Sequence, residues 1–134
     1  MPAPQIEAEP FMTLEVELDI RSVGTTPYGE REEVWFEGTA TSTMWSGERA
    51  VSGIDHIKVS STGTATIDVH TMISGDGEVI TYRGNGRATE RGVREGVIFE
   101  TSCERLAWLN DLVAVGKGTL VGDHLTIELY RMVD

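Results

Sequence analysis

Hydrophobic and polar residues alternate along this chain with a period of two, from Phe11 almost to the C-terminus. Residues 12–20 place hydrophobic side chains at every second position and Glu15, Glu17 and Asp19 between them. Because successive side chains of a strand point to opposite faces, one face of this segment is buried and the other is in water. The pattern predicts an amphipathic strand.

The same alternation recurs in short segments separated by turn residues. We expect further strands within residues 31–40, 41–47, 55–60, 65–73, 78–89, 97–102, 112–119 and 124–133. Gly24 to Gly29 predicts a loop, and Asp76–Gly77 is typical of a tight hairpin. Residues 104–110 hold at most a helical turn, so the helical spacers that a parallel sheet requires are missing.

Antiparallel strands in this number, about eight to ten, form either a sandwich or a closed barrel. Closure removes the exposed edges, and the 15 glycines supply the bends and close backbone approaches that a barrel needs. We therefore predict an all-β fold with minimal helix, built as a single antiparallel up-and-down barrel.

A length of 134 residues suits one domain. Residues 1–10 carry three of the four prolines, so we expect a flexible N-terminal arm there and one barrel domain over residues 11–134. The single cysteine, Cys103, cannot form an internal disulfide.

The formal net charge of -11 repels phosphate and anionic lipid, so neither nucleic acid nor a membrane surface is an expected partner. The sequence also lacks a run of about 18 apolar residues and a basic leader followed by an apolar stretch. We therefore expect no membrane span, no secretory signal and a cytoplasmic location.

Five short motifs lie in one order along the chain. They are G-T-T-P-Y-G-E-R at 24–31, G-I-D-H at 53–56, I-D-V-H at 67–70, G-D-G-E-V-I at 75–80 and L-A-W-L-N at 106–110. Together they resemble the calycin-like barrel family known as domain of unknown function 3237, from about Phe11 to Arg131. The resemblance implies a lipocalin-like barrel with a central cavity, frequent homo-oligomers and no established reaction. His56 and His70 depart from the family pattern, which has an aromatic residue and an arginine there.

The candidate catalytic residues are Asp55, Asp68, His70 and Glu100. Asp68 and His70 lie two apart on one strand face, where a carboxylate can orient an imidazole for acid–base chemistry. Ile67 and Val69 occupy the other face, so the pair lies either on the outer surface or, if that wall packs against another subunit, in a polar pocket. Asp55 shares a face with apolar residues and is expected to point inward, where it is either functional or paired with an arginine such as Arg83.

The candidate ligand-binding residues are Trp35, Trp45, Tyr82, Arg83 and Trp108. Tyr82 and Arg83 lie near the end of a strand, where the mouth of a barrel is expected, and an arginine there either holds a ligand anion or forms an exposed ion pair. The three tryptophans are candidates for the wall of a ligand cavity or a plug, with plain core packing as the alternative.

The sequence predicts neither a metal site nor a cofactor. His56, His70 and His124 lack the spacing of metal ligands, and no helix follows the Gly84–Asn85–Gly86 segment to receive a phosphate. The favoured function is a cofactor-independent isomerase, cyclase or lyase that moves protons in the barrel lumen, acting on a small phenolic, enone or polyketide-like substrate. The alternatives are a non-catalytic carrier of a small apolar ligand and a structural oligomer whose lumen is filled by side chains.

Overall fold

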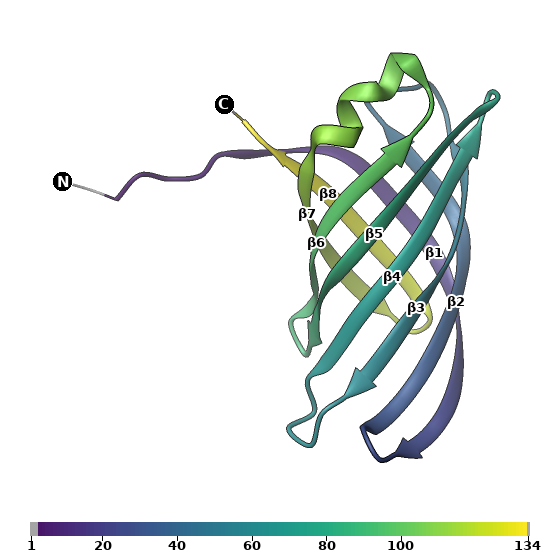
Figure 1. Ribbon diagram of the computed structural model, residues 1–134, viewed down its shortest axis with the longest axis vertical. Coiled ribbons are helices and arrows are strands. Elements are labelled where there is room, and N and C mark those ends of the chain that lie inside the picture. The colour runs from purple at the N-terminus through teal and green to yellow at the C-terminus, as the bar shows by residue number, and fades with distance from the viewer. Residues whose placement is uncertain (1–2, 134) are drawn as a thin grey trace.

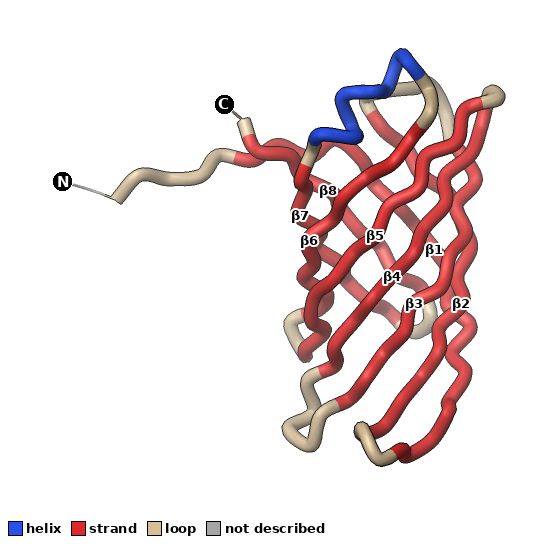
Figure 2. Tube along the Cα trace, in the orientation of Figure 1, coloured by secondary structure: helices blue, strands red, loops and turns tan. Residues whose placement is uncertain are grey.

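The computed structural model describes residues 3–133, which form a closed barrel of eight antiparallel strands and one short helix (Figure 1). The elements are β1 (Ala8–Thr26), β2 (Gly29–Ser42), β3 (Arg49–Val59), β4 (Ala65–Gly75), β5 (Glu78–Thr89), β6 (Gly92–Thr101), the 3₁₀ helix η1 (Glu104–Asp111), β7 (Val113–Val121) and β8 (His124–Met132). Each strand pairs with the next, and β8 also pairs with β1 (Figure 2). The predicted all-β up-and-down barrel is confirmed.

Strand β1 begins at Ala8, earlier than the expected end of the N-terminal arm at residue 10. Ala8 pairs with Met132 of β8, and the register shifts between Pro10 and Met12. Proline is tolerated at such an irregularity because it has no backbone N–H to donate to the ladder. Residues 3–7 extend away from the barrel wall (Figure 1), and residues 1 and 2 of the expected arm lie outside the described residues.

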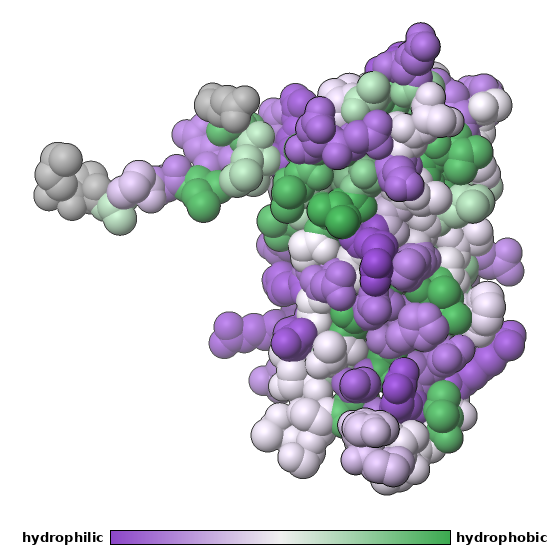
Figure 3. Space-filling model, viewed as in Figure 1, coloured by the Kyte–Doolittle hydropathy of each residue, from purple (hydrophilic) through white to green (hydrophobic). Residues whose placement is uncertain are grey.

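The alternation in the sequence corresponds to the inner and outer faces of the barrel wall. On β4, Ile67, Val69, Thr71 and Ile73 are buried inside. The outer wall is largely covered by hydrophilic side chains on the face shown in Figure 3, with small hydrophobic patches between them. The period of two therefore separates a hydrophobic lumen from a charged exterior.

The hairpin between β4 and β5 has the predicted Asp–Gly turn. Asp76 and Gly77 have φ angles of 52° and 75°, the pair of positive values that a two-residue hairpin favours. Beyond it, β5 pairs without interruption with β4 and β6 through Gly84 and Gly86. A Cβ on Gly86 would come within 2.0 Å of the Arg94 carbonyl oxygen, so glycine is needed there for close strand approach.

Helix η1 closes one end of the barrel (Figure 1). Its Leu106 and Leu109 are fully buried and belong to the hydrophobic core. Beneath them, Phe99 packs against both Phe11 and Tyr82, with ring centroids 5.9 and 5.6 Å apart. The core is therefore concentrated near the η1 end, and the opposite end of the lumen is left less filled.

Candidate functional site

A cavity of about 240 Å³ lies inside the barrel, toward the end opposite η1. Most of its lining is aliphatic, with one aromatic ring, and comes from all eight strands. The lining residues are Val16, Leu18, Ile20, Glu32, Val34, Phe36, Asp55, Ile57, Val59, Ala65, Ile67, Val69, Ala88, Val93, Glu95, Leu120, Leu125 and Ile127. The cavity thus has the apolar walls and few polar groups that are typical of small-molecule sites, and its volume is a little below their usual range of about 300–1,000 Å³.

Asp55, on β3, contributes one of the carboxyl groups in this lining. Its position opposite Val69 places it on the inner face, and its Oδ1 accepts a hydrogen bond of 3.1 Å from the backbone N–H of Asp68. Burial raises the pKa of Asp55 to about 6, because loss of water costs the charged form more than this hydrogen bond returns. The carboxyl group is therefore poised to gain or lose a proton near neutral pH.

Glu95, on β6, contributes a second carboxyl group and is only 5% exposed. Its Oε1 has no hydrogen-bond partner among residues 3–133. Burial, together with the negative charge of Asp55, raises the pKa of Glu95 to about 7. Since a buried carboxyl is normally paired, an unpartnered one that lines a cavity is a candidate for contact with a ligand.

Two glycines make room for the Glu95 side chain. A Cβ on Gly84 of β5 would lie 2.8 Å from Oε2 of Glu95, and a Cβ on Gly116 of β7 would lie 2.9 Å from Oε1. The carboxyl group thus lies against the wall in a niche between these neighbouring strands. Any side chain at either position would displace it, so the niche fixes where the carboxyl can lie.

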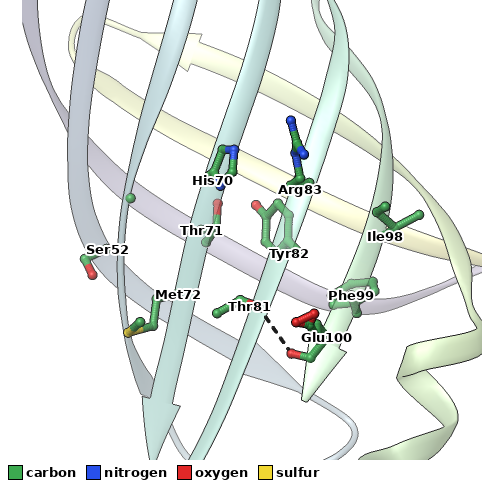
Figure 4. A pocket seen from close by; sticks show the side chains of 11 residues that line it. Ser52, His70, Thr71, Met72, Thr81, Tyr82, Arg83, Ile98, Phe99 and Glu100 are labelled. Carbon is green, nitrogen blue, oxygen red and sulfur yellow. Dashed lines mark hydrogen bonds between the residues drawn. The ribbon is translucent and has the colours of Figure 1, made fainter. Parts of the chain in front are cut away.

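Thr71 and Tyr82, which are cross-strand partners on β4 and β5, lie deeper in the lumen than the two carboxyl groups. Their hydroxyls face each other (Figure 4), and neither has a further hydrogen-bond partner among the described residues. Burial and the nearby charges of Glu95 and Asp55 raise the pKa of Tyr82, so its phenol stays neutral. We call Asp55, Thr71, Tyr82 and Glu95 the polar floor.

Among residues 3–133, the cavity lining includes no lysine, arginine or histidine. Arg83, the arginine considered as a partner for Asp55, lies on the outer wall with its Nη2 3.9 Å from Oδ1 of Asp68. Neither Asp55 nor Glu95 forms a salt bridge with another described residue. The cavity is therefore acidic and repels small anions.

Three of the four predicted catalytic residues lie outside the lumen. His70 and Glu100 are exposed on the outer face, and Asp68 is only partly buried there. The reason is the strand period: the inward positions of β4 are taken by apolar residues and Thr71, and Phe99 takes the one next to Glu100. Of the four, Asp55 alone lines the cavity, and Asp68 and His70 take the first of their two expected places, the outer surface.

His70, Arg83 and Glu100 instead line a groove of about 530 Å³ on the outer surface (Figure 4). His70 and Arg83 are cross-strand neighbours, and Thr81 donates a hydrogen bond of 3.4 Å to the Glu100 carbonyl oxygen. The groove shares Thr71 and Tyr82 with the polar floor, but neither Asp55 nor Glu95 lines it.

The predicted aromatic residues also divide between different places. Trp35 lies on the outer face and is 44% exposed. Trp108 is partly exposed at the η1 end, with its ring 6.2 Å from that of Phe11. Trp45 packs against the core at the same end, and the Arg49 guanidinium lies 4.5 Å from its ring centroid. Of the five predicted ligand-binding residues, Tyr82 alone belongs to the polar floor.

The sequence reasoning missed Glu95, Thr71 and the glycines of the niche. A signal for Glu95 was present, because Val93, Glu95, Val97 and Phe99 form one alternating series with a single acid among apolar residues. The same signal identified Asp55. The strand of Glu95 was expected to begin only at Val97, which hid it, and the role of the glycines depends on contacts between strands.

The described residues contain no group of three or more histidine, cysteine, aspartate or glutamate side chains placed to hold a metal ion. Within residues 3–133, no helix has the length and apolar character needed to cross a membrane.

Fold and site together define a small closed β-barrel with an apolar central cavity and a buried acidic cluster. The sequence matches the family model described as "Protein of unknown function (DUF3237)" over residues 6–90 and 83–132, and the chain belongs to that family. A comparison with curated proteins found no match.

Solved structures with the same fold cover nearly the whole chain. A protein with unknown function from Clostridium acetobutylicum aligns with a TM-score of 0.86 at 16% identity, covering 98% of this chain and 100% of that one. A beta-barrel like protein from Acinetobacter baumannii gives 0.83 at 24% identity, covering 98% and 99%. A structure described as an enzyme from Penicillium herquei gives 0.70 at 19% identity, covering 99% and 98%. At these identities the likeness concerns the fold.

Proposed function

We propose that this protein is a cofactor-independent enzyme that moves protons on a small organic molecule held in the barrel lumen, as an isomerase, cyclase or lyase. The observation that carries the proposal is the pair of carboxyl groups, Asp55 and Glu95, lining one apolar cavity without a cationic partner. Acid–base chemistry requires a group that takes a proton and a group that returns one, and both must titrate near the working pH.

Asp55 and Glu95 are suited to different roles. Asp55 accepts a hydrogen bond from the backbone amide of Asp68, which stabilises its charged form, so it is the carboxylate that removes a proton. Glu95 Oε1 has no such donor among the described residues, and burial and the charge of Asp55 raise its pKa, so Glu95 is the acid that supplies one.

The number of protons on the Asp55–Glu95 pair is the same before and after a reaction cycle. When one carboxylate removes a proton from the substrate and the other carboxyl returns one elsewhere on it, the pair still holds one proton at the end. Isomerisation and ring closure need no other reagent, which fits a site with apolar walls that exclude water.

The proposal is tested by solvent deuterium incorporation. Small phenols, enones and ketones are screened by thermal shift, and those that bind are incubated with the protein in D₂O and followed by NMR. We expect incorporation or ring closure that Asp55→Asn abolishes and that Glu100→Gln, on the outer face of the same strand as Glu95, leaves unchanged. Binding without any exchange by the wild-type protein would overturn the enzyme and favour the carrier.

We further propose that the protein forms a homo-oligomer, and we expect a cytoplasmic location. Cross-strand neighbours Ile98 and Val113, with Val115 beside them, expose apolar side chains on the outer face of β6 and β7. Such a patch is a candidate contact surface between copies. Light scattering coupled to gel filtration tests the assembly, and a monomer at micromolar concentration would contradict it.

A further inference from the structure

The lumen is chemically asymmetric in a way that limits what it can hold. Hydrogen-bonding groups gather at the polar floor, and among the described residues the remaining cavity lining is aliphatic except for Phe36 and the carboxyl of Glu32. Glu95 Oε1 is buried without a hydrogen-bond partner among residues 3–133, and Thr71 Oγ1 and Tyr82 Oη, farther along the lumen, have none there besides each other. A molecule entering from the end opposite η1 therefore meets its polar contacts at its leading end.

The cavity disfavours organic acids. A carboxylate or phosphate group at the floor would be desolvated beside the Asp55 carboxylate, and no described residue in the lining supplies a cation to pair with it. A protonated Glu95, which lines the cavity, instead offers a hydrogen-bond donor. Donors suit an uncharged oxygen acceptor, and a carbonyl oxygen is the acceptor that proton transfer at a neighbouring carbon uses.

The cavity volume limits the size of that molecule. About 240 Å³ is less than the roughly 300–1,000 Å³ of pockets that hold drug-sized ligands, so the cavity suits one ring system with short substituents. Long-chain or multi-ring ligands would extend out of the cavity through its open end.

We infer that the substrate is a small, neutral, enolisable ketone whose carbonyl oxygen is held by the Glu95 carboxyl while Asp55 faces the carbon next to it. This inference rests on the proposed function and names its substrate class. In the step it implies, Asp55 takes the hydrogen of that carbon as a proton. The C–H electron pair forms the enolate double bond, and the carbonyl electrons move to the oxygen, where the proton on Glu95 stabilises the charge. Reprotonation at carbon by Asp55 returns both groups to their starting state.

Gly84 and Gly116 have a defined part in this arrangement. They hold the Glu95 carboxyl against the wall, with Oε1 toward β7 and Oε2 toward β5, so that the acid keeps one position relative to Asp55. Glu95 touches the substrate oxygen in this arrangement, whereas the glycines act through Glu95 and are positioning residues.

The test uses three ring compounds of matched shape, cyclohexanone, cyclohexanol and cyclohexanecarboxylate, with the full-length protein. Affinity is measured by calorimetry, and exchange of the hydrogens beside the carbonyl is followed by NMR in D₂O. We expect cyclohexanone to bind at least about tenfold more tightly than the carboxylate, a difference of about 1.4 kcal/mol. Tighter binding of cyclohexanecarboxylate, or equal binding of all three compounds, would overturn the ketone assignment.

Variants separate this inference from the proposed function. Asp55→Asn should bind cyclohexanone but lose exchange, and Glu95→Leu should lose the preference for the ketone, while Glu100→Gln should match the wild type in both. Ketone preference without exchange by the wild-type protein would overturn the proposed enzyme and leave the ketone site standing. Exchange of other compounds in the D₂O screen, together with no preference for cyclohexanone, would overturn the ketone site and leave the enzyme standing. A Glu95→Leu protein that kept the preference would show that Glu95 does not hold the oxygen.

Discussion

Replacing Glu95 by glutamine should make the barrel more stable at alkaline pH. An acid whose pKa is raised in the folded protein keeps its proton where the unfolded chain has already lost it. Unfolding then releases a proton, so the free energy of unfolding falls as the pH rises. Glutamine has nearly the same shape and does not titrate, so the variant should lose this pH dependence.

The pKa values set the size and the range of the effect. The pKa of Glu95 rises from its ordinary 4.5 to about 7 in the folded state, mainly because the side chain is buried. The stability associated with the protonated form is complete below pH 4.5 and is lost as the pH rises through about 7, a total of about 3 kcal/mol. At about pH 8 we therefore expect Glu95→Gln to be more stable than the wild type by roughly 2–3 kcal/mol, and at about pH 5 the two should differ by less than roughly 1 kcal/mol.

Urea denaturation followed by tryptophan fluorescence, at one protein concentration and at several pH values from 5 to 8, measures this difference directly. The matched control is Glu100→Gln, which removes one negative charge from the exposed face of the same strand and should give a curve parallel to the wild type. Curves for wild type and Glu95→Gln that stay parallel across the range would refute the raised pKa, and with it the role of Glu95 as an acid near neutral pH.

Two further predictions concern packing. Gly116→Ala should destabilise the protein by about 1–3 kcal/mol in thermal unfolding, because the new Cβ would lie 2.8 Å from Cγ of Glu95. The control Gly96→Ala, whose Cβ would have nothing within 4 Å, should change stability by less than about 0.5 kcal/mol. Equal effects of the two substitutions would contradict the role of Gly116 in making room for Glu95. Leu109→Ala, in the helix that closes the barrel, should cost about 2–5 kcal/mol in urea denaturation, and Val121→Ala, at the exposed end of β7, should cost far less. A mild Leu109 variant would show that η1 does not close the core.

Much of the fold could be predicted because the information is local. The period of two in residues 12–20 and 65–73 identifies strands and their buried faces, and the Asp76–Gly77 pair identifies a hairpin whatever the rest of the chain does. The eight strands then leave few antiparallel arrangements without exposed edges.

The site was harder to predict because it depends on which strands face one another across the lumen. Asp55 was identified from its own strand, as a single acid among apolar residues. Its relation to Glu95, which lies on a strand three further along the wall, requires the closed topology. To predict the role of Gly116, the strand register must also be known. That register pairs Gly116 with Glu95 and shows that the absence of a side chain at Gly116 makes room for the Glu95 carboxyl group.

Arg49, buried at the η1 end of the barrel, has a charged partner, whereas Glu95, buried at the polar floor, has none among the described residues. This contrast supports a functional role for the polar floor. At the η1 end, the buried Arg49 donates a 2.7 Å hydrogen bond to Glu78, which also pairs with Arg105 and has its pKa lowered to about 2. A charge buried for structural reasons is expected to be paired in this way. Glu95 is equally buried, unpaired, and costs stability at neutral pH, although an apolar side chain of similar size would remove that cost. A residue that weakens the fold where it lies, in a niche that two neighbouring glycines keep open for it, is better explained by what it does to a molecule in the cavity than by what it does for the barrel.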